Sequence, residues 1–164
     1  MGHMVRGVIA INNDNMLLKS KSGIRNSKYQ LNERLSLLPL TDSDVLSISQ
    51  NSETEIDNEF SSMSERFLRL ILGQLIEGSY LFFETEYFGG DGAQSAVLIS
   101  NGKITFGPTT AEIGPINYAL SKLGVIIGEN KQDEFDTIGL DKFRSTETWL
   151  DAAEKQNSNH ENKS

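Results

Sequence analysis

The sequence predicts an α+β fold, in which an antiparallel β-sheet with hairpins packs against about three helices. Residues 79–88 alternate with the period of two that is typical of a β-strand. Residues 95–107 hold two short apolar segments joined by Asn101-Gly102, a pair that favours a type I′ hairpin turn. Residues 62–78 and 115–124 repeat apolar residues at three- and four-residue steps, which predicts amphipathic helices.

The chain length fits one domain. At 164 residues, folding buries roughly 70% of the surface of the extended chain, which is enough for a hydrophobic core. We expect a single domain from residue 5 to residue 153. Residues 1–4 have the character of a cloning remnant, and residues 154–164, which include His160, are polar enough to predict a disordered tail.

Composition argues against several classes of function. The chain has no cysteine, and its two histidines lie in the two terminal segments, so a Ser-His or Cys-His catalytic arrangement is not expected. No apolar segment approaches the about 20 residues that span a bilayer, and the N-terminus lacks the pattern of a signal peptide. We therefore expect no membrane association and a cytoplasmic location. The formal net charge of −8 repels nucleic acid and favours a basic protein as partner.

The N-terminal part of the chain is predicted less sharply. Residues 5–11 are apolar and β-branched, residues 12–15 favour a turn, and residues 16–20 are again apolar, so we expect a β-hairpin here. Residues 31–40 are compatible with a short helix that ends before Pro39 and also with an extended segment, and both alternatives remain open.

Residues 41–60 form an acidic segment without lysine or arginine, and we expect it to be a solvated, long loop. Because a basic partner would be attracted to it, its carboxylates are candidate partner-binding residues. They are Asp42, Asp44, Glu53, Glu55, Asp57 and Glu59.

The clearest predicted helix follows this segment. Ser62 and Glu65 have the spacing of a capping box, and Gly78 is a suitable end for the helix. Gly73 inside the helix lacks a side chain, which would permit the close approach of a strand.

Strand 79–88 is expected to have one buried face and one mixed face. The buried face comprises Leu81, Phe83, Thr85 and Tyr87, and the mixed face comprises Phe82, Glu84, Glu86 and Phe88. After the hairpin, Gly107-Pro108 is predicted to end the second strand. A helix is predicted to begin at Pro115 and to stop at Gly124, and a last helix to begin near Ser145 with Trp149 on its apolar side.

The glycine-rich stretch "GGDGAQ" at residues 89–94 has several possible roles. It matches neither the dinucleotide fingerprint nor the phosphate loop, and it lacks the spacing of a calcium loop, so we expect no phosphate site, metal site or cofactor. Its glycines are explained by a bulge or a tight reversal, with Tyr87 and Phe88 packed at its base. The other alternative is an exposed recognition loop, with Glu86, Tyr87, Asp91 and Gln94 as partner-binding residues.

Three stretches of the chain carry a resemblance to a known class of protein. They are "ETEYFGGDGAQSAVLISNGK", "GPINYALSKLGV" and "DEFDTIGLDKFRSTETWL", within residues 80–150. Together they resemble small bacterial immunity proteins of polymorphic toxin systems, whether contact-dependent or type VI secreted. The resemblance implies a compact, cytoplasmic, acidic and non-catalytic protein that neutralises a cognate toxin by covering its active site. It implies no catalytic residues.

Besides a small structural or regulatory adaptor, two functions from different classes follow from these observations. The first is a toxin-neutralising protein that binds a basic active site by direct contact. The alternative is a carboxylate-dependent hydrolase that uses Glu84, Glu86 and Asp91, because Glu84 and Glu86 share one face of a strand with stems about 7 Å apart.

Overall fold

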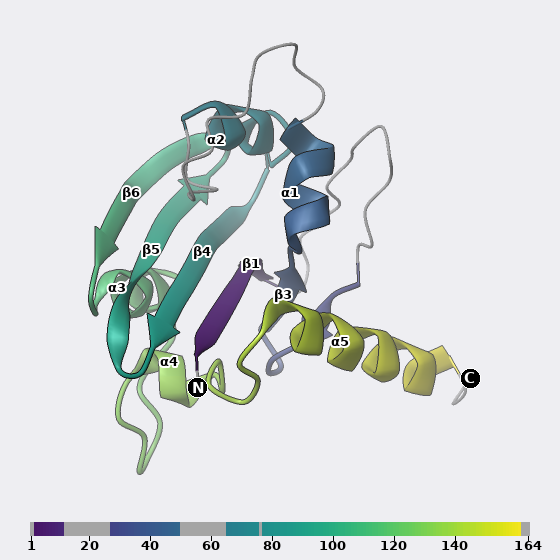
Figure 1. Ribbon diagram of the computed structural model, residues 1–164, viewed down its shortest axis with the longest axis vertical. Helices are drawn as coiled ribbons and strands as arrows, with labels where there is room; N and C mark the ends of the chain where they lie inside the picture. Colours follow the sequence, from purple (N-terminus) through teal and green to yellow (C-terminus); the bar gives the residue numbers. More distant parts are fainter. Residues whose placement is uncertain (1, 12–26, 50–64, 76, 162–164) are drawn as a thin grey trace.

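Figure 1 shows the computed structural model, which describes residues 2–11, 27–49, 65–75 and 77–161. These residues form a six-stranded antiparallel sheet and five helices, which confirms the predicted α+β class. The strands are β1 (His3–Ile11), β2 (Tyr29–Gln30), β3 (Leu35–Pro39), β4 (Ser79–Phe88), β5 (Asp91–Ser100) and β6 (Lys103–Ala111). The helices are α1 (Asp42–Ser49), α2 (Glu65–Leu72), α3 (Pro115–Lys122), α4 (Glu134–Thr137) and α5 (Thr146–Glu161).

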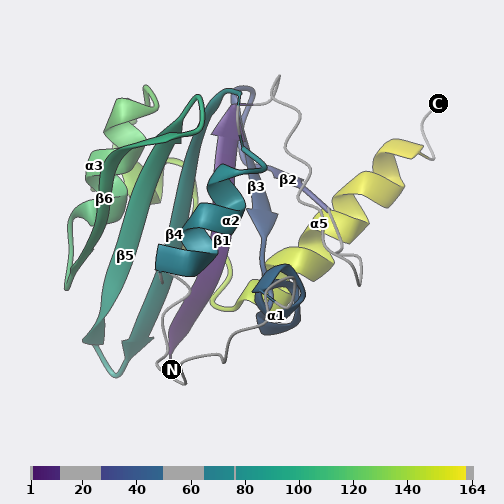
Figure 2. The same cartoon turned by 90° about the horizontal axis from the view of Figure 1, so that it is seen from above.

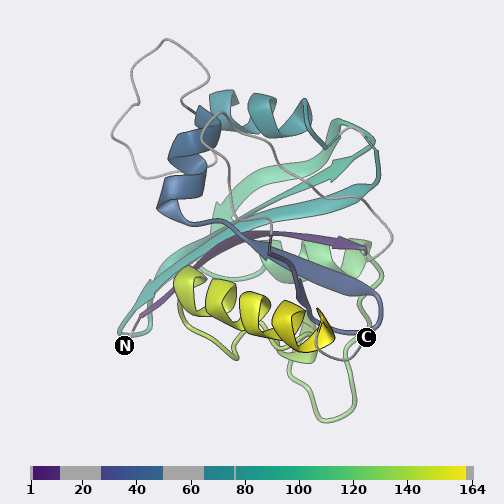
Figure 3. The ribbon, with the colours of Figure 1, turned by 90° about the vertical axis from the view of Figure 1, so that its right-hand side faces the viewer.

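The sheet lies between two layers of helices. Its strand order is β2-β3-β1-β4-β5-β6, with α1 and α2 on one face and α3, α4 and α5 on the other (Figure 2 and Figure 3). Val8 and Phe82 face the first helix layer, whereas Ile9 and Phe83 face the second, and none of the four side chains is exposed. Apolar residues therefore follow each other directly in β1 and β4, because these central strands are covered on both faces.

The neighbours of β1 differ from the predicted hairpin. From Gly7 to Ala10, one edge of β1 pairs with β3 and the other with β4, so a sequence-adjacent partner has no free edge there. The predicted partner, residues 16–20, lies outside the described residues. The open question about residues 31–40 is answered by β3, in which "LSLLP" is extended.

The first part of the acidic segment is a helix, which corrects the prediction of a long loop. The Asp44 backbone N–H donates to Thr41 Oγ1 at 3.2 Å, and the Thr41 N–H donates to Asp44 Oδ2 at 2.9 Å. This reciprocal capping begins α1 at Asp42. A Thr-x-x-Asp capping signal was therefore present in the sequence. The loop was predicted instead because the segment is strongly acidic.

Helix α2 ends earlier than predicted. It stops at Leu72 and a turn follows at Gly73, so the predicted end at Gly78 is wrong, and Ser62 of the predicted cap lies outside the described residues. Gly73 is exposed, and the nearest atoms to a Cβ added there are the carbonyl oxygens of Arg69 and Leu70, both 3.6 Å away. The predicted close approach of a strand at Gly73 is therefore wrong as well.

Both predicted reversals of the chain are two-residue hairpins. Gly89 and Gly90 connect β4 to β5 with φ values of 58° and 87°, which confirms the tight reversal. Asn101-Gly102 connects β5 to β6 with φ values of 50° and 77°, as a type I′ turn requires. Strand β6 continues through Pro108 to Ala111, whereas the sequence predicted its end at this proline. Proline is tolerated because β6 is an edge strand.

The C-terminal part contains two corrections. Helix α3 runs from Pro115 to Lys122 as predicted, but α4 was missed because it is a single turn within an acidic connection. Helix α5 begins at Thr146 as predicted and continues to Glu161, where the sequence predicted a disordered tail from residue 154. The Gln156 side chain explains part of this extension. Its Oε1 accepts from the Gln30 N–H at 2.7 Å, so α5 is held against the edge strand β2.

Candidate functional site

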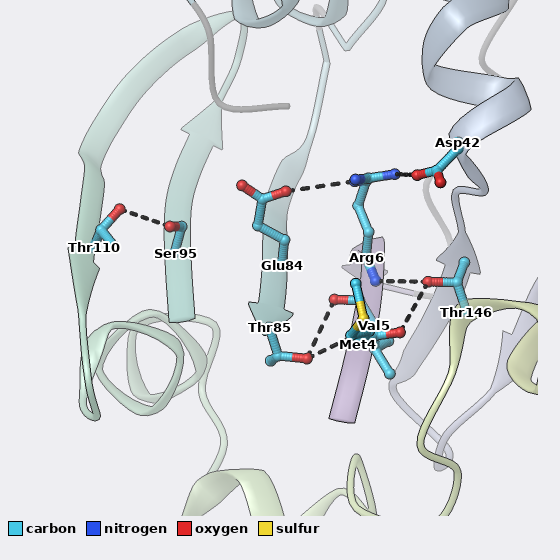
Figure 4. A network of polar contacts seen from close by, with 9 residues as sticks. All are labelled: Met4, Val5, Arg6, Asp42, Glu84, Thr85, Ser95, Thr110 and Thr146. Carbon is cyan, nitrogen blue, oxygen red and sulfur yellow. Dashed lines mark hydrogen bonds and ion pairs between the residues drawn. The ribbon is translucent and has the colours of Figure 1, made fainter. Parts of the chain in front are cut away.

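The candidate site is a half-open part of the sheet on the side of α1 and α2. We call it the open face and define it by Arg6, Glu84, Glu86, Ser95 and Thr110. It forms the floor of a pocket of about 480 Å³ whose walls include Asp42 of α1 and Glu147 of α5. Figure 4 shows how β1, β4, β5 and β6 contribute neighbouring side chains to this floor.

Strand register places four of these side chains in one row. Arg6 pairs with Glu84, Glu84 with Ser95, and Ser95 with Thr110, so their side chains point to the same face. Ser95 Oγ and Thr110 Oγ1 are 2.6 Å apart and share a hydrogen bond. The row therefore changes from a charged pair on β1 and β4 to a hydroxyl pair on β5 and β6.

Arg6 joins two carboxylates from different elements. Its Nε lies 3.4 Å from Glu84 Oε2, and its Nη1 lies 2.8 Å from Asp42 Oδ1 (Figure 4). The side chains of Arg6 and Glu84 are only 13% and 14% exposed, whereas that of Asp42 is 83% exposed. The guanidinium thus neutralises a largely buried carboxylate and also attaches the first turn of α1 to the sheet.

Glu86 lies in the next row and has a different environment. Its cross-strand neighbours are Met4 and Ala93, neither of which is charged, and its side chain is exposed. Among the described residues that line this pocket, Asp42, Glu84, Glu86 and Glu147 carry carboxylates and Arg6 carries the positive charge. The described lining of the pocket is therefore acidic.

The segment before α5 supports the edge of the open face. On the edge of β1 that pairs with β3, residues 4–6 extend beyond the end of β3 and bind the segment before α5 instead. The Arg6 N–H donates to Thr146 Oγ1 at 3.0 Å, and the Met4 N–H donates to the Arg144 carbonyl at 2.8 Å. Thr85 Oγ1 accepts from the Val5 N–H at 3.0 Å on the other side of β1. The bonds of Thr85 and Thr146 hold residues 4–6 in place (Figure 4), and Glu147, which follows Thr146 in the chain, lines the pocket.

The predicted partner-binding residues are distributed over several places. Asp42 and Glu86 are at the pocket, Asp91 is exposed at the end of the β4–β5 hairpin, and Asp44 is 7% exposed with its carboxylate engaged in the cap of α1. The remaining acidic candidates, Glu53, Glu55, Asp57 and Glu59, lie outside the described residues.

Tyr87 and Gln94 lie on the opposite face of the sheet and make internal contacts. Gln94 is 6% exposed, its Oε1 accepts from the Ile116 N–H at 2.8 Å, and its Nε2 donates to the Tyr87 hydroxyl oxygen at 3.0 Å. The Tyr87 hydroxyl donates to the Glu112 carbonyl. The amide of Gln94 therefore caps the N-terminus of α3, where Gly114 offers no side chain.

Phe88 was expected to pack at the base of the glycine turn, but it is 57% exposed. Arg6, Ser95, Thr110 and Glu147 were not singled out by the sequence. Two sequence features pointed weakly to these positions. Arg6 is a basic residue within an otherwise apolar strand, which is unusual for a buried segment. Phe88 alternates in step with Glu84 and Glu86, so it is expected on the same face of the strand as these two carboxylates.

A second cavity of about 360 Å³ lies on the opposite face and includes His3 and Phe135. The His3 ring donates from Nε2 to the Leu140 carbonyl at 3.3 Å, and its Nδ1 lies 2.7 Å from Thr85 Oγ1. Burial lowers the pKa of His3, because the charged imidazolium would lose solvent.

The structure brings together only two of the three carboxylates that the hydrolase alternative requires. Glu84 and Glu86 share the pocket as predicted, but Glu84 is bound to Arg6, and Asp91 is paired with Phe88 at the hairpin end. In the part of the chain that the structure describes, no group of three or more histidine, cysteine or acidic residues has the arrangement of a metal site.

No protein-family model matches the chain, and no curated protein or solved structure shows significant similarity to it. Among the described helices, none combines the length and apolar composition that a bilayer crossing requires.

Proposed function

We propose that the protein is a non-catalytic inhibitor that binds a basic protein toxin by direct contact and neutralises it. The observation that carries this proposal is the pocket above the open face, whose described lining combines four carboxylates with one arginine. A basic active site of a toxin that acts on a polyanionic substrate is complementary to such a surface.

The charge of the whole chain supports the same proposal. With a formal net charge of −8, the protein attracts a positively charged partner over distances beyond direct contact. This attraction increases the association rate and is screened by salt. The resemblance of residues 80–150 to bacterial immunity proteins suggests that the partner is a toxin delivered by a competing cell.

The proposal is tested with the protein encoded by the neighbouring gene. We expect this protein to slow growth when expressed alone and to be neutralised when our chain is expressed with it. The two purified proteins should form a one-to-one complex whose association rate falls as salt is raised. A well-folded chain that neither binds this protein nor restores growth would contradict the proposal.

The pocket that holds Glu84 and Glu86 also supports the second candidate, a hydrolase. Replacing both residues with glutamine separates the two functions, because glutamine preserves shape while removing the acid and base. Loss of a hydrolytic turnover with intact folding would favour the enzyme. If the glutamine variant instead neutralises the toxin more weakly, as expected from the loss of two negative charges, the inhibitor would be favoured.

A further inference from the structure

We propose that the toxin docks on the end of the open face nearest the β4–β5 hairpin, with Phe88 as the apolar anchor and Glu86 and Asp91 as its charged rim. This inference rests on the proposed function and identifies the part of the surface that performs it. The matching surface of the partner is an apolar hollow surrounded by lysine or arginine side chains.

Strand register brings these residues onto one face. Phe88, Glu86 and Glu84 alternate along β4, so they point to the same side of the sheet. Asp91 is directly opposite Phe88, and Met4 is directly opposite Glu86. The described helices of this face pack over the other end of the strands, on residues such as Phe82 and Val97, whereas Glu86 and Phe88 at this end are exposed.

Phe88 has the properties of an interface anchor. It is a large aromatic side chain that is 57% exposed, and Met4 beside Glu86 is 37% exposed. The Phe88 ring lies over Gly2, since a Cβ added at Gly2 would be 2.9 Å from Phe88 Cε1. A partner that covers this ring would remove apolar area from water at a site that is already ordered, so little conformational entropy is lost on binding.

The hairpin that carries Phe88 is continuously paired. Strands β4 and β5 are paired in unbroken register from Ser79 opposite Ser100 to Phe88 opposite Asp91. Gly92 permits this pairing, because a Cβ there would approach Glu86 O to 2.0 Å. The anchor is therefore presented in a fixed position relative to the carboxylates.

The charges around Phe88 determine the chemistry of the partner. The cross-strand neighbours of Glu86 are Met4 and Ala93, and that of Asp91 is Phe88, so the described sheet provides no cation in register with either carboxylate. Glu84 and Asp42 differ, because each is already in contact with Arg6. Lysine or arginine side chains from a partner would complete the pairs of Glu86 and Asp91.

A synthetic probe tests this face without the toxin. The full chain, labelled with ¹⁵N, is titrated with the peptide acetyl-Arg-Leu-Arg-Leu-Arg-amide, which combines apolar and basic side chains. We expect the amide shifts to cluster at residues 84–95 and the Phe88→Ala variant to bind at least about fivefold more weakly. Shifts that cluster on the opposite face of the sheet would overturn the proposal.

A matched pair of variants separates local contact from net charge. Glu86→Lys with Asp91→Lys changes the charge as much as Glu129→Lys with Asp151→Lys, and Glu129 and Asp151 are exposed residues away from the open face. We expect the first pair to weaken peptide binding at least about tenfold more than the second. Equal effects of the two pairs would show that only net charge acts and would overturn the proposal.

The growth test then distinguishes the two proposals. If the unmodified chain neutralises the toxin and the Phe88→Ala variant with Glu86→Lys and Asp91→Lys does not, both proposals are supported. If this variant neutralises equally well, the docking face is wrong while the proposed function stands. If the unmodified chain fails to neutralise, the proposed function is wrong, and the peptide titration alone decides whether the face binds apolar and basic ligands.

Discussion

Replacing Arg6 with methionine tests the charged row of the open face most directly. The change removes the guanidinium while keeping most of the aliphatic stem, so Glu84, whose side chain is 14% exposed, loses its contact with Arg6 Nε at 3.4 Å. Removing one member of a fully buried ion pair costs about 3–5 kcal/mol. Because the pocket admits some solvent and the contact is long, we expect a loss of about 2–3 kcal/mol in the free energy of unfolding.

The variant Asp42→Asn is the control, because it removes the exposed partner of Arg6. Its side chain is 83% exposed, so Asp42→Asn should cost less than about 1 kcal/mol even though its contact with Arg6 is shorter. Chemical denaturation of both variants measures the difference, and Arg6→Met should also lower Tm by about 4–12 °C. The double variant Arg6→Met with Glu84→Gln should recover part of the loss, since the negative charge that Arg6 compensates is then removed as well. If Arg6→Met were no more costly than Asp42→Asn, the burial of the ion pair would not contribute to stability.

Three further predictions concern the sheet and the helix next to it. Gln94→Ala should cost about 1–3 kcal/mol in unfolding free energy, because it leaves the buried Ile116 N–H without an acceptor; an unchanged denaturation midpoint would contradict the cap. Gly92→Ala should destabilise more than Gly90→Ala by thermal melting, since a Cβ at Gly92 would lie 2.0 Å from Glu86 O while one at Gly90 has open space; the reverse order would refute the register. Burial lowers the pKa of folded His3 below 6.5, so the unfolded chain binds more protons below that pH, and stability should decrease as pH falls from about 6.5 through the folded pKa. His3→Asn should remove this dependence.

Much of the fold was predictable because local signals and tertiary packing agree. Asn101-Gly102 forms the expected turn, Pro115 begins the expected helix, and Trp149 is buried on the expected face of α5. In each case the residue type has a backbone or burial preference that the final structure satisfies.

The failures have a common physical origin in contacts between distant residues. Strand β1 pairs with β3 and β4, and no local sequence pattern identifies these two strands as its partners. Helix α5 extends to Glu161, and the contact of Gln156 with Gln30 that holds it joins residues far apart in the sequence. The loop predicted for residues 41–60 has a different cause. Here a local signal, the capping pair Thr41 and Asp44, was present in the sequence, but the prediction relied on the acidic composition instead.

The candidate site was partly predictable for the same reasons. Alternation correctly placed Glu84 and Glu86 on one face of β4. Sequence alone did not show that Arg6 lies beside Glu84, because that depends on the register between β1 and β4. It also favoured Tyr87 and Gln94 as contact residues, although their polar atoms stabilise the hairpin and α3 from the other face.

Hydroxyl-radical footprinting of the chain with and without the neutralised toxin shows whether the toxin covers Phe88 and Met4. Phe88 and Met4 are 57% and 37% exposed, and aromatic and sulfur side chains report their exposure by the rate at which they are oxidised. We expect toxin binding to protect Phe88 and Met4, while Ile126, which is 85% exposed on the loop after α3, is oxidised at an unchanged rate. Unchanged oxidation of Phe88 and Met4 in a complex that still neutralises the toxin would contradict the proposed docking face.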